Sequence, residues 1–265
     1  SQADRTVIKG AISLPQITPG YYITPKVSFQ SNTYAATAAV TSNNPQGVAP
    51  PAQGFTIPTF SLDSGLAFER DAAELKGFFG RDMLLTMEPR AFYVYTPYQS
   101  QASTPLFDTT DAGFGVTQIF SENTFIGNDR IADNNKLTGG LTSRMIEASS
   151  GAERANITLA QRQDFTGQRV GLNGNIANPT TYSDTLGSAS VRFLGNFSAD
   201  MFGQYNTQLN KFVQTTVGGS WRPTTGRSLN FGYRNVWTPP TQAFGPTAAT
   251  QAQTTTDQYN ISGQW

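Results

Sequence analysis

The chain has 265 residues and equal numbers of basic and acidic side chains, with 18 Lys plus Arg and 18 Asp plus Glu. Charged residues make up 14% of the sequence, against roughly 25% in soluble domains, which argues against a typical cytosolic surface. The lack of cysteine and histidine excludes disulfides, Cys/His zinc sites and Ser/His/Asp triads, and a net charge of zero gives no basic footprint for nucleic acid.

Apolar residues alternate with polar ones along most of the chain, which is the period of a β-strand. In 59–69, Phe60, Leu62 and Leu66 occupy one face and Ser61 and Asp63 the other. The same alternation returns in 188–193, 213–221 and 258–265. The sequence therefore predicts eleven strands, at 3–14, 22–35, 55–70, 82–97, 134–147, 153–165, 183–195, 197–206, 210–222, 228–238 and 257–265.

The connections between these strands alternate in length. Short or moderate connections are predicted at 15–21, 71–81, 148–152, 195–196 and 223–227. Long ones are predicted at 36–54, 98–133, 166–182 and 239–256, and the short connection near 207–210 is the one exception. Bacterial outer-membrane barrels have this arrangement, with tight periplasmic turns and long external loops.

No apolar run is long enough for a membrane helix. The longest is Ala91–Tyr95, whereas a spanning helix needs about 20 residues, so only a closed β-barrel would satisfy the backbone within lipid. We therefore expect an all-β fold, an antiparallel transmembrane β-barrel. Since bacterial barrels have even strand counts, the eleven strands indicate part of a larger barrel. The first residues lack the basic start and apolar stretch of a secretory signal, so an exported protein is expected to have a beginning that is missing here.

The polar face of these strands carries more positive than negative charge. A basic interior of this kind would attract phosphate-bearing sugars or the acidic surface of a plug protein. The alternative, which we favour, is that the charges pair across neighbouring strands. The residues placed on this face are Lys9, Lys26, Asp63, Glu69, Glu88, Arg90, Lys136, Arg144, Arg154, Arg162, Arg192, Asp200 and Arg234.

Asn123, Asp129, Arg130 and Asp133 lie in the long connection before the fifth predicted strand. Their oxygen atoms would suit calcium, but the spacing is not that of an EF-hand. We therefore favour a structural role, in which these side chains brace the connection through hydrogen bonds. Glu88 and Arg90 flank Pro89, and two such residues on one face of a strand more often form a structural pair than an acid/base pair.

Several aromatic residues are predicted on the apolar face. In a soluble protein they would form a core, but their position near strand ends is more typical of the aromatic girdles at the two membrane interfaces. These residues are Phe60, Phe68, Tyr93, Tyr95, Trp221, Tyr233 and Trp237.

Long ungapped elements of the sequence resemble the LptD family, the lipopolysaccharide-assembly proteins of the Gram-negative outer membrane. The resemblance covers about residues 55–165 and is strongest in QIFSENTFIGNDRIADNNKLTGGLTSRMIE, at 118–147, which has an N-x-F-x-G-x-D-R-I element before a strand. SLDSGLAFERD at 61–71, LTMEPRAFYVYTPYQSQ at 85–101, PLFDTTDAGF at 105–114 and ERANITLAQRQDF at 153–165 are similar as well.

The resemblance implies a barrel that receives lipopolysaccharide from periplasmic bridge proteins and inserts it into the outer leaflet, with an LptE-type lipoprotein as a plug. Residues 1–265 would be part of one outer-membrane β-barrel domain. The family's N-terminal periplasmic domain, lateral gate and disulfide-forming cysteines, together with its remaining strands, would be absent. No enzymatic activity and no cofactor or metal is expected, and the implied partners are lipopolysaccharide, the plug, the bridge proteins and outer-membrane lipids.

Within that interpretation, the candidates for contact with the plug or with lipopolysaccharide lie on the polar face. They are Lys26, Glu88, Arg90, Arg144, Arg154, Arg162, Arg192 and Arg234. Two other functions stay open from the sequence. One is a porin or nutrient-receptor type channel on the same architecture, and the other is a soluble all-β enzyme or fibre domain, which alternation alone does not exclude.

Overall fold

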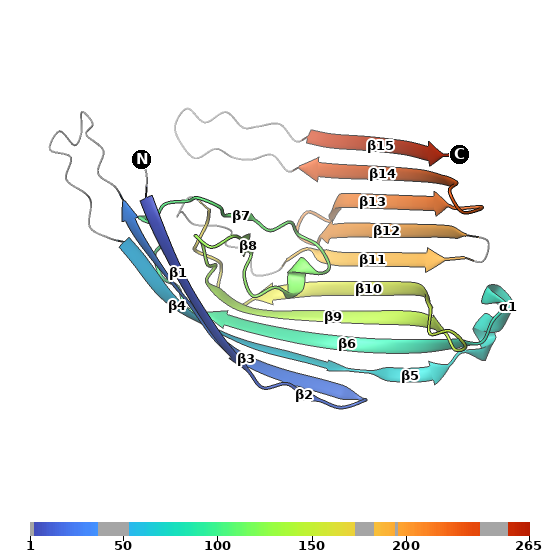
Figure 1. Cartoon of the computed structure of the whole chain (residues 1–265), viewed down its shortest axis with the longest axis horizontal. Helices are drawn as coiled ribbons and strands as arrows, with labels where there is room; N and C mark the ends of the chain where they lie inside the picture. The colour runs from blue at the N-terminus through green and yellow to red at the C-terminus, as the bar shows by residue number, and fades with distance from the viewer. Residues whose placement is uncertain (1–2, 37–52, 173–182, 194–195, 239–253) are drawn as a thin grey trace. The chain divides into compact units, whose positions relative to one another are not determined.

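The chain forms one antiparallel sheet of long strands in the computed structural model, which describes residues 3–36, 53–172, 183–193, 196–238 and 254–265. The hydrogen-bonded order of the long strands is β1-β3-β4-β6-β9-β10-β11-β12-β13-β14-β15 (Figure 1). Each strand therefore pairs with the next long strand along the chain. The long strands are β1 (Ala3–Ser13), β3 (Tyr21–Ala36), β4 (Gln53–Leu66), β6 (Met83–Thr96), β9 (Asn134–Glu147), β10 (Glu153–Asp164), β11 (Thr185–Arg192), β12 (Phe197–Asn206), β13 (Lys211–Trp221), β14 (Ser228–Thr238) and β15 (Thr254–Gln264).

All eleven predicted strands are present. The predicted strand at 55–70 is divided at Ala67 into β4 and a short β5 (Phe68–Asp71), which pairs with β6. The sequence did not predict the two-residue strands β2 (Gln16–Ile17), β7 (Thr110–Asp111) and β8 (Phe125–Ile126). The helical turns η1 (Ala73–Leu75), α1 (Lys76–Phe79) and η2 (Gln118–Phe120) are also confined to connections.

The long connections are only partly described. The predicted connection at 98–133 lies wholly within the described residues, whereas most of those at 36–54, 166–182 and 239–256 lies outside them. In the described part of the chain β1 and β15 are the two ends of the strand order, so the sheet is not closed there. None of the described helices has the length and apolar character needed to cross a bilayer.

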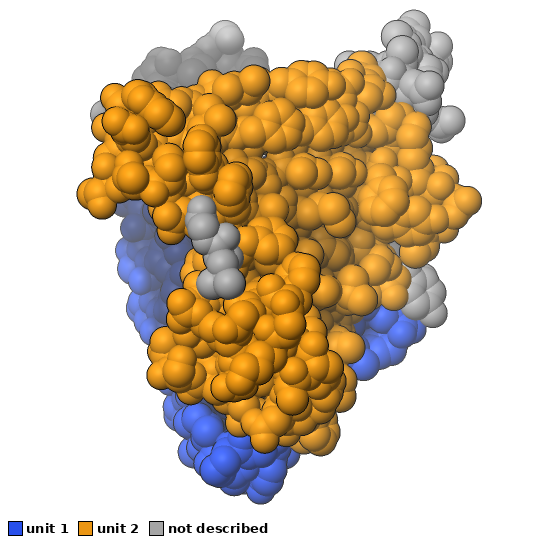
Figure 2. All heavy atoms as spheres, turned by 90° about the vertical axis from the view of Figure 1, so that its right-hand side faces the viewer, with its two compact units in different colours: residues 1–65, 91–138, 162–182 blue, residues 66–90, 139–161, 183–265 orange. Residues whose placement is uncertain are grey.

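The chain divides into two compact units, coloured separately in Figure 2. Unit 1 comprises residues 1–65, 91–138 and 162–182, and unit 2 comprises 66–90, 139–161 and 183–265. Strands β4, β6, β9 and β10 contribute a segment to each unit. Each unit is therefore described by itself.

Unit 1 has one bare face and one covered face. The register of β1 with β3 places Ile12 opposite Val27, and both side chains are exposed. On the opposite face, Tyr34, Phe55 and Ile57 pack with Ile131 from the connection between β6 and β9. A second cluster joins Phe125, Ala132 and Val170. This packing explains why Phe55 and Ile57 stand on a face that the alternation had marked as polar.

Among the described residues, unit 2 shows the predicted two-faced strands, and most side chains of β11–β14 are exposed or half-buried. On one face of β10–β14, each strand contributes one residue to a row in register, and these residues are Ile157, Ala189, Met201, Val217 and Tyr233. The side chains of Ile157 and Met201 are exposed. The opposite face carries Arg192, Asp200 and Arg234, as the alternation predicts. A small core of Ala72, Phe79 and Met83 lies beside α1.

Most of the aromatic residues predicted on the apolar face lie there. Phe60, Phe68 and Tyr95 are exposed, while Tyr93, Trp221 and Tyr233 are half-buried. Trp237 is four residues beyond Tyr233 along β14 and so occupies the same face, but its side chain is buried. The Nζ atom of Lys211 lies 4.1 Å from the centroid of its ring, so this tryptophan is covered by a cation from the neighbouring strand.

Candidate functional site

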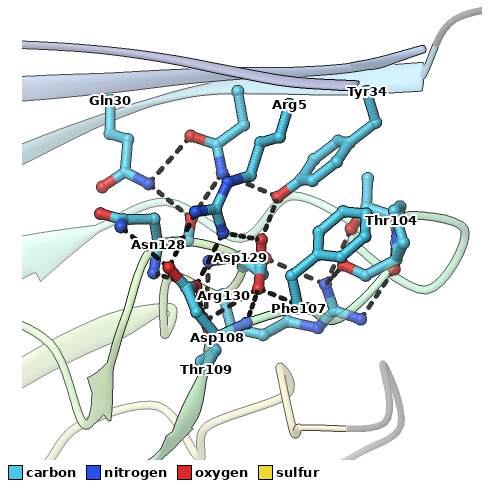
Figure 3. A network of polar contacts seen from close by, with 12 residues as sticks. Arg5, Gln30, Tyr34, Thr104, Phe107, Asp108, Thr109, Asn128, Asp129 and Arg130 are labelled. Atoms are coloured by element: carbon cyan, nitrogen blue, oxygen red, sulfur yellow. Dashed lines mark hydrogen bonds and ion pairs between the residues drawn. The ribbon is translucent and has the colours of Figure 1, made fainter. Parts of the chain in front are cut away.

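A network of buried charges joins the connection 97–133 to the covered face of unit 1 (Figure 3). At its centre is Asp129, whose side chain is fully buried. The Oδ2 atom of Asp129 accepts hydrogen bonds from the backbone N–H groups of Phe107 and Asp108, at 2.7 and 2.8 Å. The Oδ1 atom accepts from Arg5 at 2.7 Å and from the Tyr34 hydroxyl at 3.1 Å. A buried carboxylate with this number of donors is fully compensated.

Arg5 links β1 to two aspartates at once. Its guanidinium donates to both carboxylate oxygens of Asp108, at 2.7 and 2.8 Å, in addition to Asp129. The hydrogen bonds from Arg5 hold the pKa of the Asp108 carboxyl well below its usual range. The guanidinium carbon also lies 5.8 Å from the centroid of the Phe107 ring. This bidentate geometry, which a lysine would not reproduce, fixes the connection against β1.

Arg130 is buried next to Asp129 but points to backbone oxygens. It donates to the carbonyl oxygens of Thr104 at 2.8 Å and Leu172 at 3.0 Å, and to the Thr104 hydroxyl at 2.9 Å. Burial lowers the pKa of its guanidinium. Arg130 therefore ties together two segments of unit 1 that are more than 40 residues apart in the sequence.

Asn123 and Asp133 complete the bracing of the connection. The Asn123 amide donates to the Arg130 carbonyl at 3.0 Å, and its oxygen accepts from the Ala132 N–H at 2.9 Å. Asp133 accepts from the N–H groups of Arg169 and Val170, both at 2.9 Å. The predicted bracing role of Asn123, Asp129, Arg130 and Asp133 is thus confirmed. Among the described residues no group of three or more acidic side chains is placed to hold a metal ion.

The glycine of the N-x-F-x-G-x-D-R-I element is required by the backbone. Gly127 has a φ of 105°, a conformation that side-chain-bearing residues rarely adopt. A Cβ atom at this position would lie 2.4 Å from the Asp108 carbonyl oxygen. Phe125 and Ile131 of the same element are buried. Every residue that this motif specifies therefore contributes a hydrogen bond, a buried side chain or a backbone conformation that holds the connection on the sheet.

A cavity of about 510 Å³ lies between the covered face and the connection. Its polar side includes an ion pair between Lys26 and Glu122 at 3.0 Å, and Glu122 also accepts a hydrogen bond from Ser61 at 2.6 Å. Lys9, Gln30 and Asn123 contribute further polar groups, and the apolar lining comes from Ile57, Phe125 and Ile131. The cavity is therefore of mixed polarity, with an excess of one positive charge among the side chains that line it.

The predicted contact residues on the polar face are distributed in pairs. In unit 1, Lys26 pairs with Glu122, and Arg162 lies 3.5 Å from Asp164 and over the ring of Phe114. In unit 2, Arg144 pairs with Glu88 at 2.9 Å and Glu153 at 3.4 Å.

The remaining predicted contact residues also lie in unit 2. Arg154 donates to buried Glu147 at 3.0 Å, and Glu147 is also paired with Arg81. Arg90 is half-buried, and Arg192 and Arg234 are exposed.

Cross-strand pairing, the favoured interpretation, describes Glu88, Arg144 and Arg154. Lys26 instead pairs with a residue of the connection, and Arg162 with a residue of its own strand. Contact of these residues with a partner stays a prediction.

Sequence reasoning missed several members of the network. Arg5, Tyr34 and Asp108 were not singled out, although Arg5 occupies the polar face of its strand and Asp108 lies within the family-like segment 105–114. Lys136, which was placed on the polar face, is fully buried, and its ammonium has no hydrogen-bond partner in the described part of the chain. The sequence does not show where the connection lies, and these groups are buried only because the connection packs on the sheet.

Comparison with known proteins gives consistent matches along the whole chain. The model of the family described as LPS transport system D, LptD, matches residues 1–265. Proteins named LPS-assembly protein LptD are 43% identical in Cupriavidus pinatubonensis, 44% in Cupriavidus necator and 41% in Ralstonia nicotianae. Each alignment covers 100% of this chain and 31% of the relative. The chain thus spans about a third of the length of the curated relatives it matches.

Proposed function

Because the chain belongs to the LptD family, we propose that it forms part of an outer-membrane β-barrel that transports lipopolysaccharide and inserts it into the outer leaflet. The family match over all 265 residues carries this proposal. The relatives are named for LPS assembly, and the proposed activity is transport, in which no covalent bond is made or broken.

The two faces of the sheet support a membrane-spanning barrel. Exposed apolar residues such as Ile12, Ile157 and Met201 would meet the acyl chains, and the opposite polar face would line the lumen. An amphipathic cargo would then divide between the two environments, with its sugars on the polar side and its acyl chains in the bilayer. An open sheet edge is not stable in lipid, so the barrel is completed by further strands.

The covered face of unit 1 would then lie inside the barrel, and the connection 97–133 would fill part of the lumen. Charged residues predicted on the polar face are candidates for contact with lipopolysaccharide or with an LptE-type lipoprotein plug. They are Lys26, Glu88, Arg90, Arg144, Arg154, Arg162, Arg192 and Arg234. Periplasmic bridge proteins would supply the substrate.

Complementation of a strain depleted of its own protein tests this function. The full-length protein that contains this chain is expected to restore lipopolysaccharide at the cell surface, measured by labelling intact cells, and to co-purify with a lipoprotein. Recovery in the soluble fraction without detergent would refute the membrane-spanning barrel. Solute conductance in liposomes, with no effect on surface lipopolysaccharide, would instead identify a diffusion channel.

A further inference from the structure

One end of unit 2 gathers arginines and aromatic rings. It is the end where β11 turns into β12 and β13 turns into β14, and Figure 2 faces this end of unit 2. The rings of Phe197 and Trp221 stack with centroids 5.6 Å apart and an interplanar angle of 13°. The Arg227 guanidinium carbon lies 4.6 Å from the centroid of the Trp265 ring. We call the set Phe193, Phe197, Trp221, Arg222, Arg227 and Trp265 the arginine–aromatic edge.

The two turns that carry this edge are joined to each other. The backbone N–H of Arg222 donates to the Asn196 carbonyl at 3.0 Å, and the Asn196 side chain donates to the Pro223 carbonyl at 3.4 Å. Asn196 has a φ of 68°, a left-handed conformation that asparagine tolerates better than most residues. The edge is therefore built by two turns held side by side rather than by independent loops.

The charge of this edge is uncompensated. The segments 185–199, 212–231 and 258–265 contain Arg192, Arg222 and Arg227 and no Asp or Glu. In the described part of the chain, Arg222 and Arg227 make no ion pair with a carboxylate and both are exposed. The opposite ends of these strands carry two aspartates, Asp184 and Asp257, and one lysine, Lys211. Among β11–β15, the charged residues at the turn end are thus basic, whereas the opposite end carries charges of both signs.

The aromatic rings continue into the apolar face of the sheet. Trp221 is in register with both Phe197 and Leu229, and Phe197 and Leu229 are exposed together with the neighbouring Phe231. Arginine is weakly hydrated and stacks on aromatic rings, so it remains available to phosphate at a membrane interface. Aromatic rings at that level pack against the first part of an acyl chain. Phosphate and acyl chain occur together in a phospholipid.

We propose that the arginine–aromatic edge binds the head groups of anionic phospholipids in the leaflet next to the short turns, with the lipid phosphate on Arg222 and Arg227 and its acyl chains against Phe197 and Trp221. This inference rests on the proposed membrane-spanning function. It adds a lipid-binding site, distinct from the polar face, that would anchor the short-turn end at the interface.

The test compares matched variants of the full-length protein in nanodiscs of phosphatidylethanolamine with or without phosphatidylglycerol. Phosphatidylglycerol retained after detergent release is counted by native mass spectrometry. The variant R222Q/R227Q is expected to retain it less tightly, by about fivefold for each arginine replaced. Lys211→Gln, a cation beside an aromatic ring at the opposite end, is the control and should retain the wild-type amount. R222K/R227K should retain most of the lipid, since the charge is kept.

Four outcomes overturn the inference. Equal retention of phosphatidylglycerol by wild type and R222Q/R227Q, with both folded by heat-modifiable gel migration, removes the site. Displacement of the lipid by inorganic phosphate shows a simple anion site without a lipid component. If the wild-type protein does not insert into membranes at all, the proposed function fails and this inference fails with it, whereas insertion without lipid selectivity overturns the inference alone.

Discussion

Unit 1 and unit 2 have the same alternation of apolar and polar residues but differ in what lies on the polar face. In unit 1 the connection 97–133 packs against that face and buries Asp129 and Arg130. In unit 2 Arg192 and Arg234 on the same kind of face are exposed. The comparison shows that alternation decides which face a side chain occupies, whereas the connections decide whether that face is a buried network or a solvated surface.

The largest effect is expected from Asp129→Ala. The change leaves the backbone N–H groups of Phe107 and Asp108 without this acceptor and removes one carboxylate from Arg5. We expect the local free energy of opening of the connection to fall by about 3 kcal/mol or more. Hydrogen exchange of residues 97–133 in the full-length protein measures it. Asp111→Asn, an exposed aspartate in the same connection, is the control, and equal protection in both variants would contradict the central role of Asp129.

The second prediction concerns the backbone of the connection. Gly127→Ala forces a Cβ against the Asp108 carbonyl at a φ of 105°, and we expect a loss of about 1–3 kcal/mol. Gly113→Ala is the matched change, because an added Cβ there has no atom within 4 Å. Limited proteolysis should cleave the Gly127 variant faster within 97–133. The same cleavage rate in both variants would show that the connection tolerates another path.

The third prediction distinguishes two roles of the charged residues in unit 2, which are ion pairing within the protein and attraction of a partner by positive charge. Reversal of Arg144 together with Arg154 is expected to impair lipopolysaccharide delivery or plug association if the positive charge of the polar face matters, but Arg154 also compensates buried Glu147. The exchange of Glu88→Arg with Arg144→Glu is sharper, because it restores the 2.9 Å pair in the opposite sense. If pairing alone matters, the single variant R144E loses up to about 1 kcal/mol. The exchange recovers the part that comes from Glu88 but not the part from Glu153, because the carboxylate placed at position 144 repels that residue.

Surface labelling of lipopolysaccharide in cells carrying the exchange decides between the two roles. Normal delivery leaves the pair a structural element. Reduced delivery from a protein of normal stability assigns a contact to this part of the polar face.

The fourth prediction is a pH dependence of the connection in unit 1. Arg5 lowers the pKa of Asp108 relative to an unfolded value of about 3.9. The stabilisation is therefore present above about pH 4 and is lost as the pH falls toward the lower pKa of the folded state. Hydrogen exchange of the connection should rise over that range in the wild type. Asp108→Asn should show less of this rise, and an unchanged acid profile would assign it to other carboxylates.

The smallest effect is expected from Arg234→Gln on the bare face of unit 2. Its side chain is exposed, so we expect a change in the free energy of unfolding within about 0.5 kcal/mol. Thermal unfolding of the full-length protein checks this. A larger loss of stability would show that the polar face of unit 2 is covered in the complete protein, as it is in unit 1.

The sequence was sufficient for the strands because their signal is local. The predicted strands at 134–147, 197–206 and 228–238 coincide with β9, β12 and β14, since a period of two is written into neighbouring residues. The break at Ala67 and the strands β7 and β8 were missed, because they depend on pairing that a short segment does not encode.

The sequence predicted only part of the candidate site. Asn123, Asp129, Arg130 and Asp133 were recognised as braces of a connection, but their partners Arg5, Tyr34 and Thr104 were not identified. Arg5 and Asp129 are 124 residues apart, and no periodicity relates them. A long-range contact of this kind needs the fold before it can be assigned.

By itself the sequence determined the family, the strands and the face that each strand residue occupies, because these properties follow from motifs and from the geometry of an extended chain. Only the tertiary structure decided that the connection 97–133 returns to the sheet, where Asp129 meets Arg5 of β1 and Tyr34 of β3. The physical reason is that a carboxylate such as Asp129 is stable in the interior only when donors from distant segments surround it, and those donors meet only when the chain has folded.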